Sequence, residues 1–400
     1  MADNKIKELG NKTPLEAAYK PNIDALAGKS EMGLVNTQDE EFEPGSDIGN
    51  LTILGYDPKK YYTGRSPLEA ANMGAVMKDT DIAARCNLVT LSEDVTSSEN
   101  EIYENKTMLD YSAGEISTEE AGILINYLNK ELGGEHFKFY TGTSYRHCLI
   151  WSGGPEGLVL TPPHNFSDKK ITPFMPEGTG AEKLTELQKK SCKLLKNHPL
   201  NIERKNKGLK PANSIWIWGA GKKPLLLDFG MKYGLKPSMV SAVDLLKGIG
   251  RYAGFNVVDV PGATGTIHTN FEGKARAVIK EFERGQDFVF IHIEAPDECG
   301  HQGDLKNKIK SIELIDEKIA GPLYKYLSNN LKDTGEHFNI MILPDHYTPV
   351  ESKTHTKEPV PYIIYKSNGE KLNDYGYSEE NAGKTNIFIQ EGYKLIDIFI

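Results

Sequence analysis

Blocks of apolar residues alternate with amphipathic stretches along most of this chain, a pattern that predicts strands followed by helices. The clearest block, FVFIHI at residues 288–293, is short and is bounded by polar, glycine and proline residues. Such a block is typical of a buried strand in a parallel sheet. Alternation of this kind at both ends of the chain predicts an α/β fold.

Between residues 79 and 211 the pattern changes to short strands separated by single helices. The polar stretch KNKGLKPANS closes this segment, and βα alternation then resumes. A small α+β unit inserted into a larger fold would give this order. We therefore expect a core built from residues 1–78 and 212–400, and an inserted domain at 79–211. The length of 400 residues agrees with this division, since it exceeds the usual size of one hydrophobic core.

Local signals set the bounds of several elements. Thr13, Pro14 and Glu16 predict a capping box at the start of one helix over residues 13–30. The stretch EGLVLTPPH, residues 156–164, predicts a strand that ends in a proline-rich turn.

Acidic and histidine side chains collect at the ends of predicted strands. Asp297 and His301 follow the first apolar block, Asp345 and His346 end the block FNIMILPDH, and His355 precedes a third block, PVPYIIY. Ligands in open α/β sheets bind at the carboxyl ends of strands, and carboxylate and imidazole groups hold divalent metals. Five such candidates from separate strand ends suggest a two-metal site.

An alternative interpretation treats part of this set as structural. Asp297 would then cap the following helix, and His301 would be a surface residue. Cys299, which lies between them, could be a soft ligand, although a loop spacer is the simpler interpretation. The second Asp/His group, on a different strand, favours the metal hypothesis.

The turn Gly45-Ser46-Asp47 precedes a helical stretch. A serine hydroxyl there lies where backbone N–H groups and the helix dipole favour anions, which suits a nucleophile that becomes phosphorylated. The alternative is that Ser46 only caps the helix. Arg65 stands at another turn into a helix, where it could hold a phosphate or remain solvated.

Composition narrows the class of protein. The chain is 38% hydrophobic and 26% charged, as is ordinary for a globular protein. No apolar run approaches the length of a membrane span, and the start lacks a secretory signal. The four cysteines form no CxxC pair, which predicts reduced thiols in a cytoplasmic protein. A net charge of −9 without a Lys/Arg stripe argues against a nucleic-acid partner but allows a small anionic substrate.

Several long segments are specific enough to suggest a family. They are PGSDIGNLTILGYDP, YYTGRSPLEAA, RCNLVTL, SYRHCLIW, LTPPH, NSIWIWGAG, GATG with TNFEGKA, APDECGH, PDH and THTKEPVPY. In these segments, which run along essentially the whole chain, the protein resembles the archaeal type of cofactor-independent phosphoglycerate mutase in the alkaline-phosphatase superfamily. The resemblance implies a mostly parallel, alkaline-phosphatase-like sheet with helices on both faces and a smaller inserted α+β cap domain. It also implies interconversion of 2-phosphoglycerate and 3-phosphoglycerate through a phosphoserine.

The resemblance assigns roles to individual residues. Ser46 is implied as the nucleophile. Asp297, His301 and His355 are implied as ligands of one divalent ion, and Asp345 and His346, together with Ser46, as ligands of a second; manganese or zinc is expected, and magnesium is possible. Basic residues in matching segments are implied as holders of the substrate phosphate and carboxylate, although each could serve a structural ion pair instead: Arg65, Arg85, Arg146 and Lys274.

Two alternative functions stay open at this point. One is a related phosphotransferase acting on another small alcohol, with a homoserine kinase-like activity. The other is a catalytically impaired relative that binds ligands. In the family an apolar strand ending in Asp-Gly normally precedes the segment seen here as Met1-Ala2-Asp3, and that Asp is a metal ligand. We therefore expect either a true start roughly ten residues upstream, or an open position in the sheet and a weakened second metal site.

Overall fold

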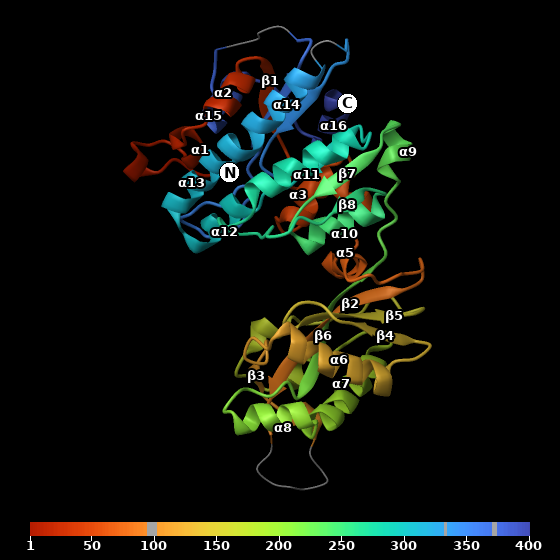
Figure 1. Cartoon of the computed structure of the whole chain (residues 1–400). Coiled ribbons are helices and arrows are strands. Elements are labelled where there is room, and N and C mark those ends of the chain that lie inside the picture. The colour runs from red at the N-terminus through yellow and green to blue at the C-terminus, as the bar shows by residue number, and fades with distance from the viewer. Residues whose placement is uncertain (94–101, 332–333, 370–373) are drawn as a thin grey trace. The chain divides into compact units, whose positions relative to one another are not determined.

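The chain folds into two compact units, which are described separately. The computed structural model describes residues 1–93, 102–331, 334–369 and 374–400. The first unit comprises Met1–Tyr62 and Leu226–Ile400, and the second unit is the continuous segment Thr63–Leu225 (Figure 1). The predicted insertion at 79–211 lies inside the second unit, and its bounds stay a prediction. No helix within the described ranges is long and apolar enough to cross a membrane.

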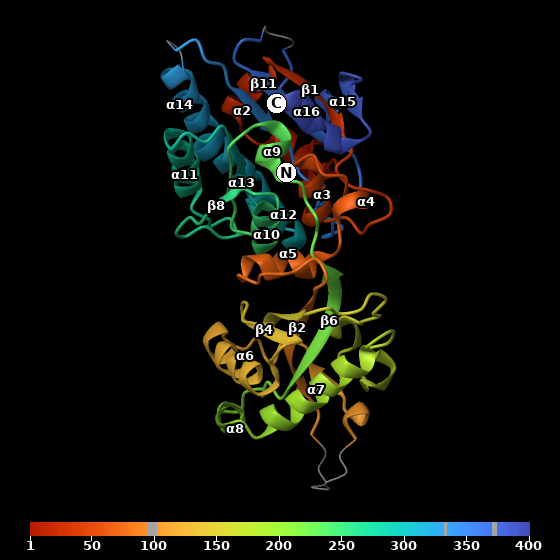
Figure 2. The same cartoon turned by 90° about the vertical axis from the view of Figure 1, so that its right-hand side faces the viewer.

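The larger sheet of the first unit joins segments from both ends of the chain. β1 (Ser30–Val35) pairs antiparallel with β11 (Val360–Lys366) and parallel with β12 (Phe388–Ile389). β10 (Asn339–Ile342) pairs antiparallel with β11, which gives the order β10–β11–β1–β12. Figure 2 shows β1 and β11 side by side.

The smaller sheet of the first unit is parallel. β7 (Pro237–Val240) lies between β8 (Asn256–Val258) and β9 (Phe288–Ile291). Among the described residues β9 pairs only with β7 and β10 only with β11, so each is the edge strand of its sheet. Apart from the buried Phe288, the apolar side chains of β9 and β10 are half-buried, whereas the sequence predicts a fully buried strand at β9.

Helices cover the sheets of the first unit. α11 (Phe271–Glu283) packs against β7 and β9, while α2 (Pro21–Ala27) and α15 (Glu379–Lys384) pack against β1 and β11. Each large apolar side chain that they bury stabilises the unit by about 1.5–3 kcal/mol. The predicted α/β class is therefore confirmed. The other α-helices of this unit are α1 (Pro14–Ala17), α3 (Ser46–Ile53), α4 (Pro58–Tyr61), α9 (Phe229–Tyr233), α10 (Asp244–Tyr252), α12 (Ala295–Gln302), α13 (Leu305–Ile315), α14 (Gly321–Leu331) and α16 (Leu395–Phe399).

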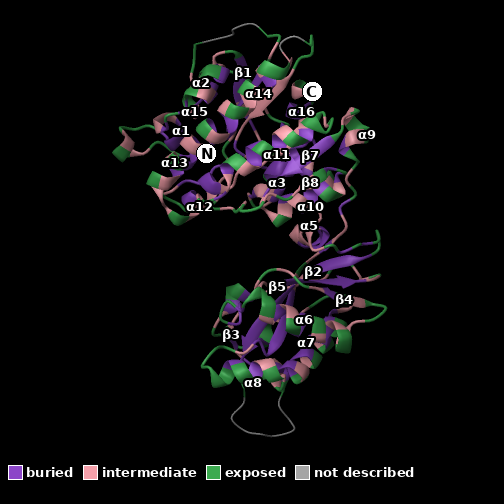
Figure 3. Cartoon of the chain, viewed as in Figure 1, coloured by how far each residue is buried: buried purple, intermediate pink, exposed green. Residues whose placement is uncertain are grey.

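The second unit is built on one antiparallel sheet. β2 (Ile82–Leu91) pairs with β5 and β6 along most of its length and with β3 at its end, and β4 pairs with β5. α6 packs against β4, and α7 packs against β6. Figure 3 shows that the central strand β2 is buried along nearly its whole length, and only Arg85 is partly exposed. The bounds are β3 (Met108–Asp110), β4 (Phe137–Tyr140), β5 (Arg146–Trp151), β6 (Ser214–Lys222), α5 (Arg65–Asn72), α6 (Thr118–Leu132), α7 (Ala181–Lys196) and α8 (Pro199–Asn206).

Two local elements differ from those predicted from the sequence. The predicted helix at 13–30 is interrupted between α1 and α2 because Pro21 has no N–H to continue the ladder and instead begins α2. The predicted capping box at Thr13 is present. The predicted strand at 156–164 is wrong: only Val159 forms an isolated bridge, and Pro163–Phe166 is a 3-10 helix.

Candidate active site

Ser46 is the first residue of α3 and follows the N-cap residue Gly45. Because Gly45 occupies the N-cap position, the alternative that Ser46 is the N-cap of this helix is wrong. Instead, Ser46 Oγ lies 3.0 Å from His346 Nε2. His346 Nδ1 lies 3.2 Å from the carbonyl oxygen of Tyr347, which can only accept, so Nδ1 carries the proton. The Ser46 hydroxyl therefore donates to the lone pair of His346 Nε2.

Two amide side chains hold the start of α3 against Asp345. Asn50 Nδ2 donates to Asp345 Oδ2 at 2.9 Å and to the Ser46 carbonyl oxygen at 2.8 Å. Gln38 Nε2 donates to the Asp345 carbonyl oxygen at 2.8 Å, and Gln38 Oε1 accepts from Gly45 N at 2.9 Å. The nucleophile candidate and the acidic ligand candidate are thus positioned together. Sequence reasoning missed both amides.

Gly49 allows this close approach. A Cβ atom at Gly49 would lie 2.6 Å from the Asp345 carbonyl oxygen and 2.7 Å from Gln38 Nε2, closer than van der Waals contact permits. Helix α3 can therefore pack against the Asp345 segment only because this position has no side chain. A glycine in the interior of a predicted helix is the one signal in the sequence that could have indicated the contact.

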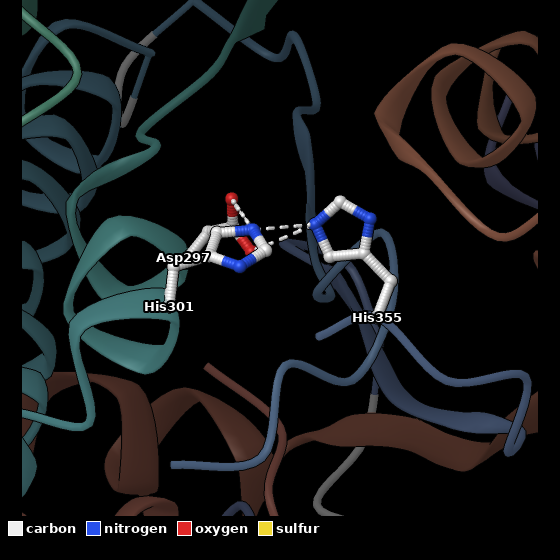
Figure 4. Close-up of side chains that lie close together, drawn as sticks. All are labelled: Asp297, His301 and His355. Atoms are coloured by element: carbon white, nitrogen blue, oxygen red, sulfur yellow. Dashed lines mark hydrogen bonds and ion pairs between the residues drawn. The ribbon is translucent and has the colours of Figure 1, made fainter. Parts of the chain in front are cut away.

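Asp297, His301 and His355 lie close together and could hold a metal ion (Figure 4). Asp297 and His301 are four residues apart on α12 and therefore share a face. His355 comes from the segment before β11. Its Nε2 atom is 2.8 Å from His301 Nε2 and 3.4 Å from Asp297 Oδ1. The structure thus brings together three of the five predicted ligands in one group.

The histidine tautomers fit a metal at this group. His301 Nδ1 lies 2.9 Å from the Lys353 carbonyl oxygen, and His355 Nδ1 lies 3.1 Å from the Pro44 carbonyl oxygen. Each Nδ1 must donate, so both Nε2 lone pairs point toward the centre of the group. Two lone pairs 2.8 Å apart require a proton or a cation between them.

The electrostatics agree with that requirement. Burial acts to raise the pKa of Asp297, but His301 and His355 beside it outweigh burial and hold the pKa well below its usual range. Asp297 in turn raises the pKa of His301 to about 9. The carboxylate is therefore ionised at neutral pH and favours positive charge at the centre of the group.

The remaining two predicted ligands adjoin this group. Asp345 Oδ2 is 3.5 Å from His346 Nε2, and Asp297 Oδ1 is 3.9 Å from His346 Nδ1. Burial lowers the pKa of His346, so this imidazole is neutral at pH 7. Burial acts to raise the pKa of Asp345, but His346 and His292, together with Ser46, outweigh burial, and the net pKa is lowered. Ser46, Asp345 and His346 therefore form a second group of potential ligands that is continuous with the first.

Lys274 and Glu294 border the cluster. Lys274 is fully buried on α11, and its Nζ donates to the His292 carbonyl oxygen, just after β9, at 3.2 Å. Burial lowers its pKa to about 8. Burial also raises the pKa of Glu294 to about 7, with Asp297 adding to the effect. The sequence pointed to Lys274 but not to Glu294.

The three predicted arginines belong to the second unit. Arg65 begins α5. Arg85 on β2 makes a two-pronged ion pair with Glu69 and lies 4.7 Å from the ring centre of Trp218. Arg146 begins β5 and is exposed. In the register of the sheet Arg146 is opposite Asn87, two residues along β2 from Arg85, so both arginines are on the same face.

Comparisons with known proteins were made once this geometry was established. A family model described as 2,3-bisphosphoglycerate-independent phosphoglycerate mutase matches residues 27–201. A protein of Geobacter sulfurreducens, described as a probable enzyme of that name, is 43% identical over 401 residues, covering 100% of this chain and 97% of the relative. A relative from Methanosarcina mazei with the same description is 44% identical over 403 residues, with coverage of 100% and 97%.

Two solved structures resemble this chain over its whole length. The PH0037 protein from Pyrococcus horikoshii superposes with a TM-score of 0.81 at 29% identity, covering 100% of this chain and 93% of that one. A structure titled cofactor-independent phosphoglycerate mutase from Thermoplasma acidophilum has a TM-score of 0.70 at 25% identity, with coverage of 100% and 96%.

Proposed function

The chain belongs to the family of 2,3-bisphosphoglycerate-independent phosphoglycerate mutases, and from this premise we propose that it interconverts 2-phosphoglycerate and 3-phosphoglycerate through a phosphorylated Ser46. The observation that carries the proposal is the position of Ser46 Oγ, 3.0 Å from His346 Nε2 at the start of α3, beside a cluster of ligand-type side chains.

The cluster fits two divalent ions. Asp297, His301 and His355 would hold one, and Ser46, Asp345 and His346 the other. Bound manganese or zinc, or magnesium as a further possibility, would lower the pKa of the Ser46 hydroxyl and neutralise charge on the phosphoryl oxygens.

The residues of the first unit prepare the nucleophile and its surroundings. In the metal-free protein His346 Nε2 accepts the hydrogen bond of the Ser46 hydroxyl, so the His346 lone pair and the Ser46 oxygen already face one another where an ion would be held. A phosphate carried by Ser46 would lie at the N-terminus of α3, where backbone N–H groups and the helix dipole favour negative charge. Lys274 of α11 is buried, and its amino group reaches the end of β9, where it can neutralise one anionic group.

The reaction then balances as two transfers. Ser46 Oγ bonds to phosphorus as the bond from phosphorus to the substrate oxygen breaks, and that oxygen takes up a proton. In the second transfer the other hydroxyl of glycerate bonds to phosphorus as the bond from phosphorus to Ser46 Oγ breaks. The proton of that hydroxyl passes to Ser46, which is thereby restored. Arg65, Arg85 and Arg146 stay proposed holders of the substrate phosphate and carboxylate, a task that suits the planar guanidinium group.

A coupled assay tests the proposal. Metal-free protein is reloaded with Mn²⁺ and given 3-phosphoglycerate, with enolase reporting the 2-phosphoglycerate formed. Homoserine with ATP is supplied in parallel, to cover the alternative phosphotransferase. We expect activity only with 3-phosphoglycerate, and a peptide bearing phosphorylated Ser46 when the reaction is stopped in acid. Turnover of homoserine alone would overturn the proposal, and activity with neither substrate would favour the impaired relative.

Ser46→Ala and a matched serine variant separate catalysis from helix capping. Ser378 is a true N-cap, since its Oγ accepts from Asn381 N at 3.1 Å at the start of α15. Ser378→Ala should lose about 0.5–2 kcal/mol of stability and retain activity. Ser46→Ala should abolish activity with little effect on stability. Activity of Ser46→Ala equal to that of Ser378→Ala would refute the nucleophile role.

A further inference from the structure

Thr348 lies between the two groups of potential metal ligands. Its hydroxyl donates to Asp297 Oδ1, and the same oxygen lies 3.1 Å from His346 Nδ1. A threonine hydroxyl has one hydrogen, so after donating to Asp297 it can only accept from His346. This acceptor keeps the proton on Nδ1 and leaves the Nε2 lone pair toward Ser46. One hydroxyl thus orients a ligand from each group.

A fully buried ion pair holds the backbone of Thr348. Lys308 on α13 and Asp3 are 0% and 1% exposed, and Lys308 Nζ is 2.7 Å from Asp3 Oδ2. The Lys308 ammonium group also donates to the Thr348 carbonyl oxygen at 2.7 Å and to the Ala2 carbonyl oxygen at 3.2 Å. An ammonium group has three donors, so all of them are used.

The same segment is held from two more directions. Asp3 Oδ2 accepts from Val350 N at 3.1 Å, two residues beyond Thr348. On the other side Gly300 of α12 lies so close that a Cβ atom there would be 2.4 Å from the Thr348 carbonyl oxygen. Gly300 precedes His301 and follows Asp297 on the same helix. Burying an ion pair is costly unless it is fully hydrogen-bonded, and here those hydrogen bonds go to the segment that bears His346.

We propose that Thr348 is a positioning residue that fixes Asp297 and His346 for metal binding, and that the Lys308–Asp3 pair holds Thr348 in place. This rests on the proposed metal-binding role of the cluster. Groups that orient metal ligands through hydrogen bonds change metal affinity when they are removed, even though they do not touch the ion. The two ion positions share this hydroxyl, so its loss weakens both.

The first test replaces the hydroxyl alone. Metal-free Thr348→Val, Thr348→Ser and Thr90→Val proteins are titrated with Mn²⁺ by calorimetry and compared with the unmodified protein. Thr90 is the matched control: it is 4% exposed against 3% for Thr348, and its hydroxyl donates to the Pro211 carbonyl oxygen in the second unit at 2.7 Å. We expect Thr348→Val to lose about 10- to 100-fold in affinity. Thr348→Ser should keep most of the affinity, because it keeps the hydroxyl, and Thr90→Val should keep all of it.

Two results would overturn the role of Thr348. One is unchanged Mn²⁺ affinity in Thr348→Val. The other is an equal loss in Thr348→Ser, which would point to packing of the side chain rather than to its hydrogen bond.

The second test asks whether Lys308 acts through Thr348. Lys308→Met is compared with Arg204→Met, which removes another buried cation, one that pairs with Glu120 in the second unit. Both variants should melt at lower temperature, but only Lys308→Met should bind Mn²⁺ more weakly. In the double variant Lys308→Met/Thr348→Val, the loss of affinity should be clearly smaller than the product of the two single losses. Losses that simply multiply would contradict the link, and if Lys308→Met does not fold, the Thr348 series decides the proposal.

The mutase assay of unmodified protein keeps the two proposals apart. Protein that binds Mn²⁺ but does not convert 3-phosphoglycerate would refute the proposed function, and the Thr348 series could still be measured. Active protein whose Thr348→Val variant binds Mn²⁺ normally would refute only the positioning role.

Discussion

Replacing Gly49 with alanine should change the free energy of unfolding in two opposite ways. Alanine has the higher helix propensity, but its side chain would collide with the Asp345 segment that packs against α3. In an unobstructed helix the change should stabilise the protein by about 1 kcal/mol. At Gly49 the new Cβ atom would lie 2.6 Å from the Asp345 carbonyl oxygen, which costs about 1–3 kcal/mol in overpacking. Losing the hydrogen bond from Gln38 to that oxygen adds about 0.5–1.5 kcal/mol. The net loss is then about 0.5–3.5 kcal/mol.

Gly122 on α6 is the matched control. A Cβ atom there meets only Thr141 Cγ2, at 3.6 Å, which is ordinary contact. Gly122→Ala should therefore raise the melting temperature and leave activity unchanged. Gly49→Ala should lower the melting temperature, by about 2–4 °C for each kcal/mol lost, and should reduce activity because Asp345 is displaced. Calorimetric melting and the coupled assay measure both effects. A Gly49→Ala protein that is stabilised as much as Gly122→Ala and fully active would refute the reasoning.

Three further predictions address the cluster and the arginines. In metal-free protein the pKa of His301 is about 9 against the ordinary 6.5, so its stabilising effect is complete below pH 6.5 and is lost as the pH rises through 9; melting temperatures should show this fall, and it should shrink in His301→Gln. Asp297→Asn should lower bound metal and activity together, and full metal content by elemental analysis would exclude Asp297 as a ligand. Arg146→Lys should reduce activity although the charge is kept, because ammonium cannot bind an anion through two parallel hydrogen bonds; Arg251→Lys, at an exposed position on α10, is the control, and equal kinetics of the two variants would contradict the role.

The sequence predicted the candidate ligands because strand ends are local features. Apolar blocks mark the strands, and Asp297, Asp345 and His346 come directly after them, so only the general rule for open α/β sheets was needed. The helix break at Pro21 could also have been predicted from the sequence, because proline has no N–H to continue the helical hydrogen bonds.

The supporting residues could not be predicted in this way. Gln38, Asn50 and Lys308 act through partners about 300 residues away, namely the Asp345 segment and Asp3. Nothing in their neighbouring sequence distinguishes them from ordinary polar residues. Their roles follow only from how the segments pack, which local patterns do not encode.

The order of segments in the first unit bears on how the protein is synthesised. Ser46 meets His346 only after 300 further residues have been made, which at typical rates of translation takes about 15–60 s. The second unit, by contrast, is one continuous segment that can fold as soon as it leaves the ribosome. During that interval the early part of the first unit, including β1, has no β11 to pair with. The edge of β1 that β11 covers in the folded protein is therefore unpaired throughout this interval, and a pause in translation before residue 360 would prolong its exposure.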